Sequence, residues 1–388
     1  MFKIKTLNKI SPLGLDLFPK DKYEVGNDIA NPDAILVRSA EMGDMEIPSS
    51  VIAIARAGAG YNNIPVQRCS DSGIVVFNTP GANANAVKEL TLASLFLSSR
   101  NIVGGINWTS TVADKPDVAE LVEKEKSKFT GPEIKGKTLG VVGLGAIGVM
   151  VANDAISLGM DVIGYDPYIS VDAAWNLSRE VIRADSLDSL LSKSDYITLH
   201  LPLGDNTKGL LNAEKLALVK NDARIINFSR NALVIDKDII AALEGGKLSA
   251  YVTDFPTPEL LACKKVIAIP HLGASTPEAE DNCAIMAVKQ IMECLENGSL
   301  RNSVNFPRCK LEQRTPYRLI VVNKNIPNMV GQITTNLANA NINILDLINH
   351  HRDDYGYNII ETEQNIPAPV LDQIRKVNGI IRVRLIER

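Results

Sequence analysis

The sequence predicts an α/β protein with two doubly wound parallel sheets, followed by a smaller unit of βαββαβ order. Three observations lead to this fold class. Short apolar runs alternate with helical patterns through most of the 388 residues, as is typical of parallel strands buried on both faces. A glycine-rich turn follows one of these runs in the middle of the chain, and the order of strands and helices changes after residue 314.

The segment before residue 100 predicts the first sheet. Its apolar runs at 34–37, 51–55 and 74–77 are short and rich in β-branched residues, which indicates buried parallel strands. A long apolar helix is expected at 85–99. Residues 101–131 are polar and are expected to be irregular.

A glycine motif predicts a dinucleotide site in the second sheet. Gly143, Gly145 and Gly148 follow the apolar strand 138–142 and precede a helical pattern that ends near Gly159. Glycines at this spacing allow a tight turn and a close approach to a pyrophosphate at the start of a helix. The alternative is a glycine-rich turn that binds nothing.

Asp166 supports the dinucleotide reading. It ends the next apolar strand, 161–165, about 20 residues after the glycines, where an acid binds the ribose 2′-hydroxyl of NAD. No Arg or Lys follows directly to receive a 2′-phosphate, so NAD is favoured over NADP.

The second sheet continues with strands expected near 196–201, 224–228, 249–253 and 265–269. Helices are expected at 213–219 and 237–245, and a long one at 276–295. We therefore assign residues 101–278 to an NAD-binding Rossmann-like domain, inserted into a substrate-binding domain formed by residues 1–100 and 279–305.

The tail predicts a ferredoxin-like unit over residues 315–388. Strands are expected at 318–322, 342–348, 357–363 and 380–386, with helices at 329–338 and 370–377. Such units often pair with one another, so an oligomerising or ligand-sensing role is expected.

Composition excludes several classes of protein. The net charge of −4 argues against general nucleic-acid binding, and no run of 18 apolar residues predicts a membrane span. The five cysteines are scattered without a C-x-x-C pair, so we expect reduced thiols and no metal site. The first residues lack the apolar core of a secretion signal, so a cytoplasmic location is expected.

Three kinds of side chain suited to hydride-transfer chemistry follow strands of the second sheet. His271 follows the last predicted strand, Arg230 follows 224–228, and Asp254 and Glu259 follow 249–253. Imidazole can take a hydroxyl proton near neutral pH, a carboxylate can orient it, and a guanidinium can bind a substrate carboxylate. Taken singly, these residues also suit a helix-capping histidine, a surface ion pair and a solvated carboxylate.

Ordered motifs over nearly the whole chain resemble the D-isomer-specific 2-hydroxyacid dehydrogenases. They are Val37-Arg38-Ser39, Arg56 to Gly60, Asn78-Thr79-Pro80 with Glu89-Leu90, Gly136-Lys137-Thr138, His200 to Leu203 with Thr207, Asn227 to Arg230, and Pro270 to Ser275. The sequence departs from the family in having Asn231 in place of Gly, and Pro258-Glu259 in place of Glu-Pro.

The resemblance implies a role for each matching residue. Arg230, Glu259 and His271 are implied to be catalytic, as the substrate-binding arginine, the acid paired with histidine and the acid/base. The implied cofactor-binding residues are Gly143, Gly145, Ala146, Ile147, Gly148, Asp166, His200, Pro202, Thr207, Asn227, Ser229, Asp254, His271 and Gly273. The implied substrate-binding residues are Arg38, Ser39, Arg56, Ala57, Gly58, Asn83 and Arg230.

Within the family, the chain most resembles the branch that oxidises 3-phosphoglycerate to 3-phosphohydroxypyruvate in serine biosynthesis. Arg38 and Arg56 at two strand ends suit a substrate phosphate. The alternative for them is ion pairs internal to the domain. Rival functions are another D-2-hydroxyacid dehydrogenase acting on glycerate or lactate, and a non-catalytic NAD(H)-sensing protein.

The tail resembles the small regulatory ACT domain that many such dehydrogenases carry. The resemblance implies an amino-acid effector site near Asn323, Asn325 and Asn343. Serine is one candidate effector, and a purely structural, dimer-forming domain is the alternative. A homodimer or homotetramer is expected.

Overall fold

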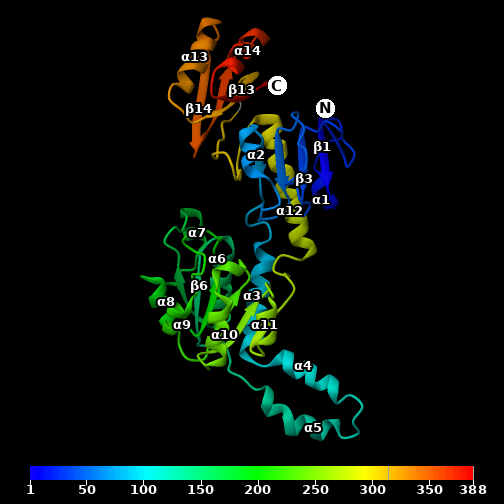
Figure 1. The fold of residues 1–388 in the computed structure, drawn as a ribbon, viewed down its shortest axis with the longest axis vertical. Helices are drawn as coiled ribbons and strands as arrows, with labels where there is room; N and C mark the ends of the chain where they lie inside the picture. Colours follow the sequence, from blue (N-terminus) through cyan, green and yellow to red (C-terminus); the bar gives the residue numbers. More distant parts are fainter. Residues whose placement is uncertain (313, 388) are drawn as a thin grey trace. The chain divides into compact units, whose positions relative to one another are not determined.

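A computed structural model describes residues 1–312 and 314–387 (Figure 1). The chain forms two compact units. The first unit comprises Met1–Asn83 and Pro277–Arg388, and the second unit comprises Ala84–Thr276. Among the helices of the described residues, none is both long and apolar enough to cross a membrane.

The first unit contains a parallel five-stranded sheet in the order β2-β1-β3-β4-β5. Its strands are β1 (Phe2–Leu7), β2 (Tyr23–Gly26), β3 (Ala34–Val37), β4 (Ala53–Arg56) and β5 (Val75–Phe77). The strands expected near 34–37, 51–55 and 74–77 are confirmed. The helices α1 (Pro12–Leu15) and α2 (Val66–Asp71) lie in the connections between strands.

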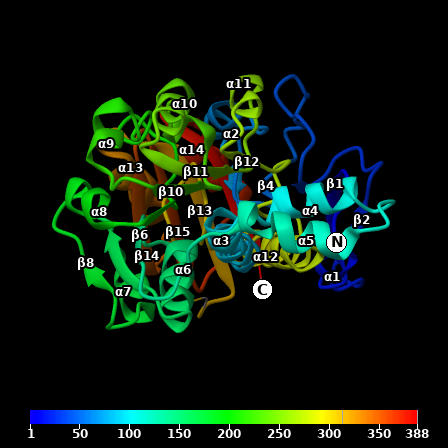
Figure 2. The same ribbon diagram turned by 90° about the horizontal axis from the view of Figure 1, so that it is seen from below.

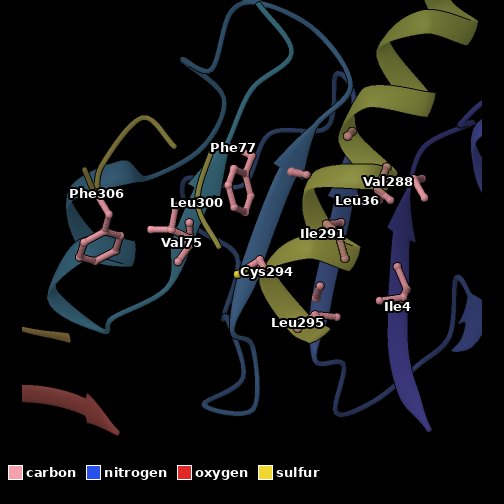
Figure 3. Close-up of a cluster of buried hydrophobic side chains, with 14 of the residues drawn as sticks. Ile4, Leu36, Val75, Phe77, Val288, Ile291, Cys294, Leu295, Leu300 and Phe306 are labelled. Carbon is pink, nitrogen blue, oxygen red and sulfur yellow. The ribbon is translucent and has the colours of Figure 1, made fainter. Parts of the chain in front are cut away.

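One long helix, α12 (Pro277–Asn297), completes the core of this sheet. In Figure 3, its side chains Val288, Ile291 and Leu295 lie beside Ile4 and Leu36 of the strands. A Cβ at Gly14 of α1 would lie 2.6 Å from the Cβ of Ala284, so only glycine allows the two helices to approach this closely. Each fully buried aliphatic side chain contributes about 1.5–3 kcal/mol. Residues 1–83 therefore complete their core only with a segment nearly 200 positions later in the chain.

The second unit contains a parallel seven-stranded sheet in the order β12-β11-β10-β9-β6-β7-β8. Its strands are β6 (Thr138–Val142), β7 (Asp161–Tyr165), β8 (Ile182–Arg183), β9 (Tyr196–Leu199), β10 (Ala223–Asn227), β11 (Leu248–Thr253) and β12 (Val266–Ala268). The chain first builds outward from β6 to β8 and then crosses back to β9. The order therefore reverses between β6 and β9, where open α/β sheets bind their ligands.

Helices cover both faces of this sheet (Figure 2). On one face, α3 (Ala84–Ser99) and α6 (Ala146–Ser157) bury Val87, Leu95 and Val151 against the strands. The helices of the other face are α8 (Leu187–Lys193), α9 (Ala213–Leu218), α10 (Asp236–Glu244) and α11 (Pro258–Ala262). A short helix, α7 (Val171–Asn176), follows β7.

The expectation of an irregular chain at 101–131 is wrong. The structure has α4 (Ile102–Thr111), α5 (Val118–Glu125) and the 3₁₀ turn η1 (Lys126–Phe129) there. The side chain of Asn101 accepts a hydrogen bond from the Gly104 N–H and caps α4. The rings of Trp108 and Phe129 pack with centroids 5.5 Å apart. No residue of α4 or α5 is buried, so neither helix contributes to a core of the described residues.

The C-terminal segment forms an antiparallel sheet in the order β14-β15-β13-β16, and the βαββαβ prediction is confirmed. Its elements are β13 (Tyr317–Lys324), α13 (Met329–Asn339), β14 (Ile344–Arg352), β15 (Tyr355–Thr362), α14 (Ala368–Lys376) and β16 (Ile380–Glu387). Leu319, Val321 and Ile360 pack in the core with the two helices. Ile320 and Tyr357 belong to the core that contains α12.

The compact units divide the chain differently from the predicted domains. The helix α3 lies in the second unit because it packs on α6, β10 and β11, so the boundary falls at residue 83 and not at 100. The C-terminal sheet belongs to the first unit because it shares a core with α12. The predicted functional domains at 1–100 with 279–305, 101–278 and 315–388 stay a prediction.

Two arginines of the C-terminal sheet bind the end of α12. Arg318 is fully buried, and its guanidinium donates to Glu361 (2.7 Å), to the Asn297 carbonyl (2.6 Å) and to the Leu311 carbonyl (2.8 Å). Arg384 donates to the carbonyls of residues 294 and 295. Cations are favourable at the negative end of the helix dipole, and these bonds satisfy carbonyls that have no partner within the helix.

We predict that Glu361→Gln destabilises the first unit by about 3 kcal/mol, because it removes the counter-charge of a fully buried guanidinium. Urea unfolding followed by circular dichroism measures the shift in midpoint. The matched control is Glu312→Gln, which breaks the exposed Arg314–Glu312 pair (3.3 Å) and should cost less than about 1 kcal/mol. Equal shifts for the two variants would contradict the prediction.

Candidate active site

The glycine turn between β6 and α6 is shaped for close approach of a ligand. Gly143 has φ +94°, and a Cβ there would lie 2.4 Å from the His200 carbonyl oxygen. A Cβ at Gly148 would lie 1.9 Å from the Gly143 oxygen. Both positions therefore need glycine for the fold. A Cβ at Gly145 would meet nothing within 4 Å, so this glycine is not explained by packing within the chain.

Asp166 ties the end of β7 to this turn. One carboxylate oxygen accepts the Leu144 N–H at 2.9 Å, and the other accepts the Tyr168 N–H at 2.8 Å. The side chain is only partly buried. It is thus fixed beside the turn while its remaining lone pairs can still accept bonds from a ribose.

The residues around the turn fit a dinucleotide. Gly145 and Ala146 border a cavity of about 490 Å³ that extends along α6 to α7. The first N–H groups of α6 have no partner within the helix and carry the positive end of its dipole. The open space at Gly145, together with these donors, suits a pyrophosphate.

The loop after β9 contributes three of the predicted cofactor residues. Burial lowers the pKa of His200 to about 3, so its ring is neutral, and Nε2 lies 3.0 Å from the Thr198 hydroxyl. The Thr207 hydroxyl donates to the Pro202 carbonyl at 2.7 Å and accepts the Gly204 N–H. These bonds fix the turn of residues 202–207, which follows β9 at the place where the strand order reverses.

The end of β10 positions Arg230. The buried Asn227 amide donates to the Arg230 carbonyl at 2.9 Å and accepts the Ser229 N–H at 3.1 Å. The Ser229 hydroxyl donates to the carbonyl of Leu199 at the end of β9. The Arg230 guanidinium is exposed, and its one side-chain bond within the described residues goes to the Ser229 carbonyl. Its other donors are left for a ligand.

Asp254, at the end of β11, lies next to the loop of His271. The side chain of Asp254 is buried, and one oxygen accepts the Gly273 N–H at 2.9 Å. Burial raises the pKa of Asp254, while the Gly273 N–H and the charges of His271 and Arg230 lower it. Its Oδ1 has no hydrogen-bond partner among the described residues. The carboxylate of Asp254 thus feels the charges of His271 and Arg230, and the catalytic grouping of the three residues stays a prediction.

His271 has an unusual backbone. Its φ is +42°, and its N–H donates to the Asp254 carbonyl at 3.0 Å. Left-handed φ values are uncommon for residues other than glycine and concentrate at functional sites. The ring lies 5.2 Å from that of Phe255, centroid to centroid. Phe255 was not among the predicted residues, and its only signal was an aromatic residue directly after the strand-end acid.

Glu259 lies apart from this group. It occupies the first turn of α11, whose N-cap Thr257 accepts the Leu260 N–H, and its side chain is exposed. Among the described residues it forms no hydrogen bond or ion pair with His271. Its pairing with the histidine stays a prediction.

Two of the predicted substrate residues of the first unit, Arg38 and Arg56, lie at the carboxyl ends of neighbouring strands. Arg38 follows β3 and Arg56 ends the neighbouring β4. Arg38 pairs with Glu280 of α12 at 2.7 Å, both partly exposed. A Cβ at Gly58 would meet the Arg56 guanidinium at 2.2 Å, so glycine leaves room for that side chain. Burial raises the pKa of the Cys283 thiol, and the charges of both arginines oppose the shift.

The remaining predicted residues of the first unit lie in the loops after β3 and β4 and in the turn before α3. The Ala57 N–H donates to the Val37 carbonyl at 2.8 Å. The Ser39 N–H donates to the Asn8 side chain, and Ser39 is exposed. Asn83 lies in the turn just before α3.

Comparisons with known proteins identify the family. Residues 95–273 match the model described as "D-isomer specific 2-hydroxyacid dehydrogenase, NAD binding domain". D-3-phosphoglycerate dehydrogenase of Haemophilus influenzae is 31% identical, over 99% of this chain and 94% of that protein. The chain belongs to the D-isomer-specific 2-hydroxyacid dehydrogenases. The prediction of NAD as cofactor is confirmed by the family match.

Two further similar proteins are also 3-phosphoglycerate dehydrogenases. D-3-phosphoglycerate dehydrogenase of Methanocaldococcus jannaschii is 34% identical over 84% of this chain, and the chain spans 61% of that protein's length. A solved NAD⁺-bound 3-phosphoglycerate dehydrogenase of Entamoeba histolytica is 26% identical, with a TM-score of 0.60 over 78% of this chain and 98% of that one. The two-sheet α/β architecture is therefore that of the family.

We predict that Gly145→Ala weakens NADH binding while leaving the fold intact, because the added methyl enters open space that the pyrophosphate needs. Titration of NADH fluorescence should show at least a tenfold rise in Kd, with Tm within about 2 °C of the parent, since a surface substitution costs little stability. Gly43→Ala, also in open space but in the first unit, serves as the control and should change neither value.

A Gly145→Ala variant that binds NADH normally would show that the turn does not approach the cofactor. Gly148→Ala is the second comparison. Its Cβ would meet a backbone oxygen at 1.9 Å, so this variant should lose both stability and binding.

Proposed function

We propose that this 2-hydroxyacid dehydrogenase oxidises 3-phospho-D-glycerate to 3-phosphohydroxypyruvate, the first step of serine biosynthesis. The observation that carries the proposal is the pair of arginines at adjacent strand ends of the first unit, Arg38 and Arg56, in a chain whose relatives are D-3-phosphoglycerate dehydrogenases. Two guanidinium groups suit a phosphate far better than the methyl or hydroxymethyl group of lactate or glycerate.

His271 is the proposed acid/base. Its imidazole takes the proton of the C2 hydroxyl as the C2–H bond breaks, and it returns the proton in the reverse reaction. NAD, when bound, accepts the hydride. The positive φ of His271 and its N–H bond to Asp254 hold the imidazole at the end of β12.

Arg230 and two carboxylates complete the proposed catalytic set. Arg230 binds the substrate carboxylate through donors that its one intramolecular bond leaves free. Asp254 stabilises the imidazolium electrostatically, because it is buried and interacts with both His271 and Arg230. Glu259 is proposed to pair with His271 once substrate is bound.

The cofactor residues keep their proposed roles. Gly143, Gly145, Ala146, Ile147 and Gly148 form the turn at the pyrophosphate, and Asp166 binds the adenosine ribose. The further residues proposed to line the cofactor site are His200, Pro202, Thr207, Asn227, Ser229, Asp254, His271 and Gly273. On the substrate side, Ser39, Ala57, Gly58 and Asn83 are proposed to accompany the two arginines.

The proposal extends to assembly and regulation. We propose a homodimer or homotetramer, supported by α4 and α5, which project from the rest of the second unit in Figure 1 and expose Ile106 (61%) and Val103 (39%). An amino-acid effector such as serine is proposed at the C-terminal sheet. Asn323 is buried, and its side-chain oxygen accepts a hydrogen bond from Asn358. Asn325 and Asn343 are exposed, so these two residues are the ones proposed to contact the effector. Sedimentation and an L-serine titration test the two points.

Steady-state assays with NADH test the proposed reaction. We expect kcat/KM for 3-phosphohydroxypyruvate to exceed that for hydroxypyruvate and pyruvate by at least 100-fold, since a phosphate bound by two arginines contributes at least about 3 kcal/mol. A preference for an unphosphorylated acid would favour a glycerate- or lactate-type enzyme. No turnover of any of the three would favour the NAD(H) sensor.

We predict that Arg38→Ala raises KM for 3-phosphohydroxypyruvate tenfold or more and leaves KM for pyruvate within twofold, because only the former substrate carries a phosphate. The matched control is Glu280→Gln, which removes the partner of Arg38 but keeps the arginine. If Arg38 serves only the ion pair, both variants should give the same small change with both substrates.

A further inference from the structure

The first unit contains a cavity lined by charged residues that have no part in the proposed reaction. It has a volume of about 190 Å³ and is lined by Glu293, Ser299, Leu300, Arg301, Arg308 and Lys310. We propose that this cavity binds a compact oxyanion with two or more negative charges, of the phosphate or polycarboxylate type. The inference does not rest on the proposed function.

Backbone pairing brings the three cations together. The segment after α12 turns back on itself, and Leu300 and Cys309 exchange both backbone hydrogen bonds, at 2.7 and 3.0 Å. In antiparallel pairing this sets Arg301 opposite Arg308 and sets Lys310 opposite residue 299. Leu300 and Cys309 are buried, while the three cations are exposed. Like charges facing each other across a strand pair are destabilising, and a bound anion reverses that cost.

The charge of this cluster is not balanced by the protein. Within the described residues, Arg301, Arg308 and Lys310 take part in no ion pair and no side-chain hydrogen bond. Glu293 is the only carboxylate lining the cavity, which leaves two excess positive charges. By contrast, Lys324 of the same unit has an acidic partner within 3.1 Å.

Backbone contacts of the lining residues fix the geometry of the cavity. The His350 ring lies 2.9 Å from the Arg308 carbonyl oxygen and anchors that residue's backbone. The Ser299 N–H donates to the Glu293 carbonyl, so the serine is held at the end of α12.

The size and donor set define the ligand class. The cavity of about 190 Å³ has room for a phosphate group or a small polycarboxylate. Two guanidinium groups offer planar pairs of N–H donors, which match two oxygens of one anion, and lysine adds a point charge. A singly charged anion would leave at least one cation unpaired.

The ligand would connect three parts of the chain. Glu293 belongs to α12, Ser299 and Arg301 begin the segment that leads to the C-terminal sheet, and Arg308 and Lys310 end it. An anion held by all of them fixes this segment against α12. We therefore expect binding to raise the Tm of the full-length protein as well as to give a measurable Kd.

Isothermal titration of the full-length protein without NAD tests the proposal, with inorganic phosphate and citrate as separate probes and acetate at equal ionic strength as the reference. At least one divalent or trivalent probe should bind with 1:1 stoichiometry. The variant Arg301→Gln/Arg308→Gln should weaken that binding at least tenfold, whereas Arg179→Gln/Arg183→Gln, which removes two exposed arginines of the second unit, should change it less than twofold.

Two further variants keep the outcome unambiguous. Binding that persists in Arg38→Ala would show that the anion does not occupy the proposed substrate phosphate site. If the double variant Arg301→Gln/Arg308→Gln does not fold, Lys310→Gln is tested in its place. Binding of citrate alone identifies a polycarboxylate ligand, and binding of phosphate alone identifies a phosphate group. Unchanged affinity in the cavity variants, or an equal effect of acetate, would overturn the proposal.

Discussion

The first unit depends on α12, because this helix joins segments that are far apart in the sequence into one core. Its apolar face supplies Val288, Ile291 and Leu295 to the parallel sheet of residues 1–83. Its C-terminal carbonyls are bonded by Arg318 and Arg384 of the C-terminal sheet. Removing the helix would expose the sheet on one side and leave buried guanidinium donors without acceptors on the other. The cost of an unpaired buried charge exceeds that of most apolar truncations.

A different constraint governs the second unit. The parallel sheet reverses its order between β6 and β9, and the two strands end at Gly143 and His200, whose backbones approach so closely that no Cβ fits at Gly143. That packing requirement explains two of the three glycines of the motif. The third, Gly145, faces open space, so packing within the described residues does not require glycine there, and its contact with a pyrophosphate stays a proposal. Within the motif, Gly143 and Gly148 are therefore required by packing, whereas Gly145 is not.

Much of the fold could be predicted, because parallel strands buried on both faces appear in the sequence as short apolar runs. The strands at 138–142 and 161–165 have the expected bounds. The strand β1 was missed because lysines interrupt its apolar positions, and half of its residues are only partly buried. The helices α4 and α5 were missed because the polar composition of this segment was taken to indicate an irregular chain; no residue of either helix is buried, and of the two only α4 has a side-chain N-cap.

The candidate site could be predicted as a set of strand ends but not as a set of contacts. Sequence order places Asp254 and His271 after neighbouring strands, and parallel topology brings such ends together. It does not give the left-handed backbone of His271, which allows its N–H to reach the Asp254 carbonyl, nor the burial that raises the pKa of Asp254. These features arise from packing around the loop. For the same reason the buried Arg318–Glu361 pair, which joins residues 43 positions apart, has no signature in composition or periodicity. From sequence alone, a charged residue such as Arg318 within a strand is expected to face solvent. Only the tertiary structure shows that it binds the carbonyls at the end of α12.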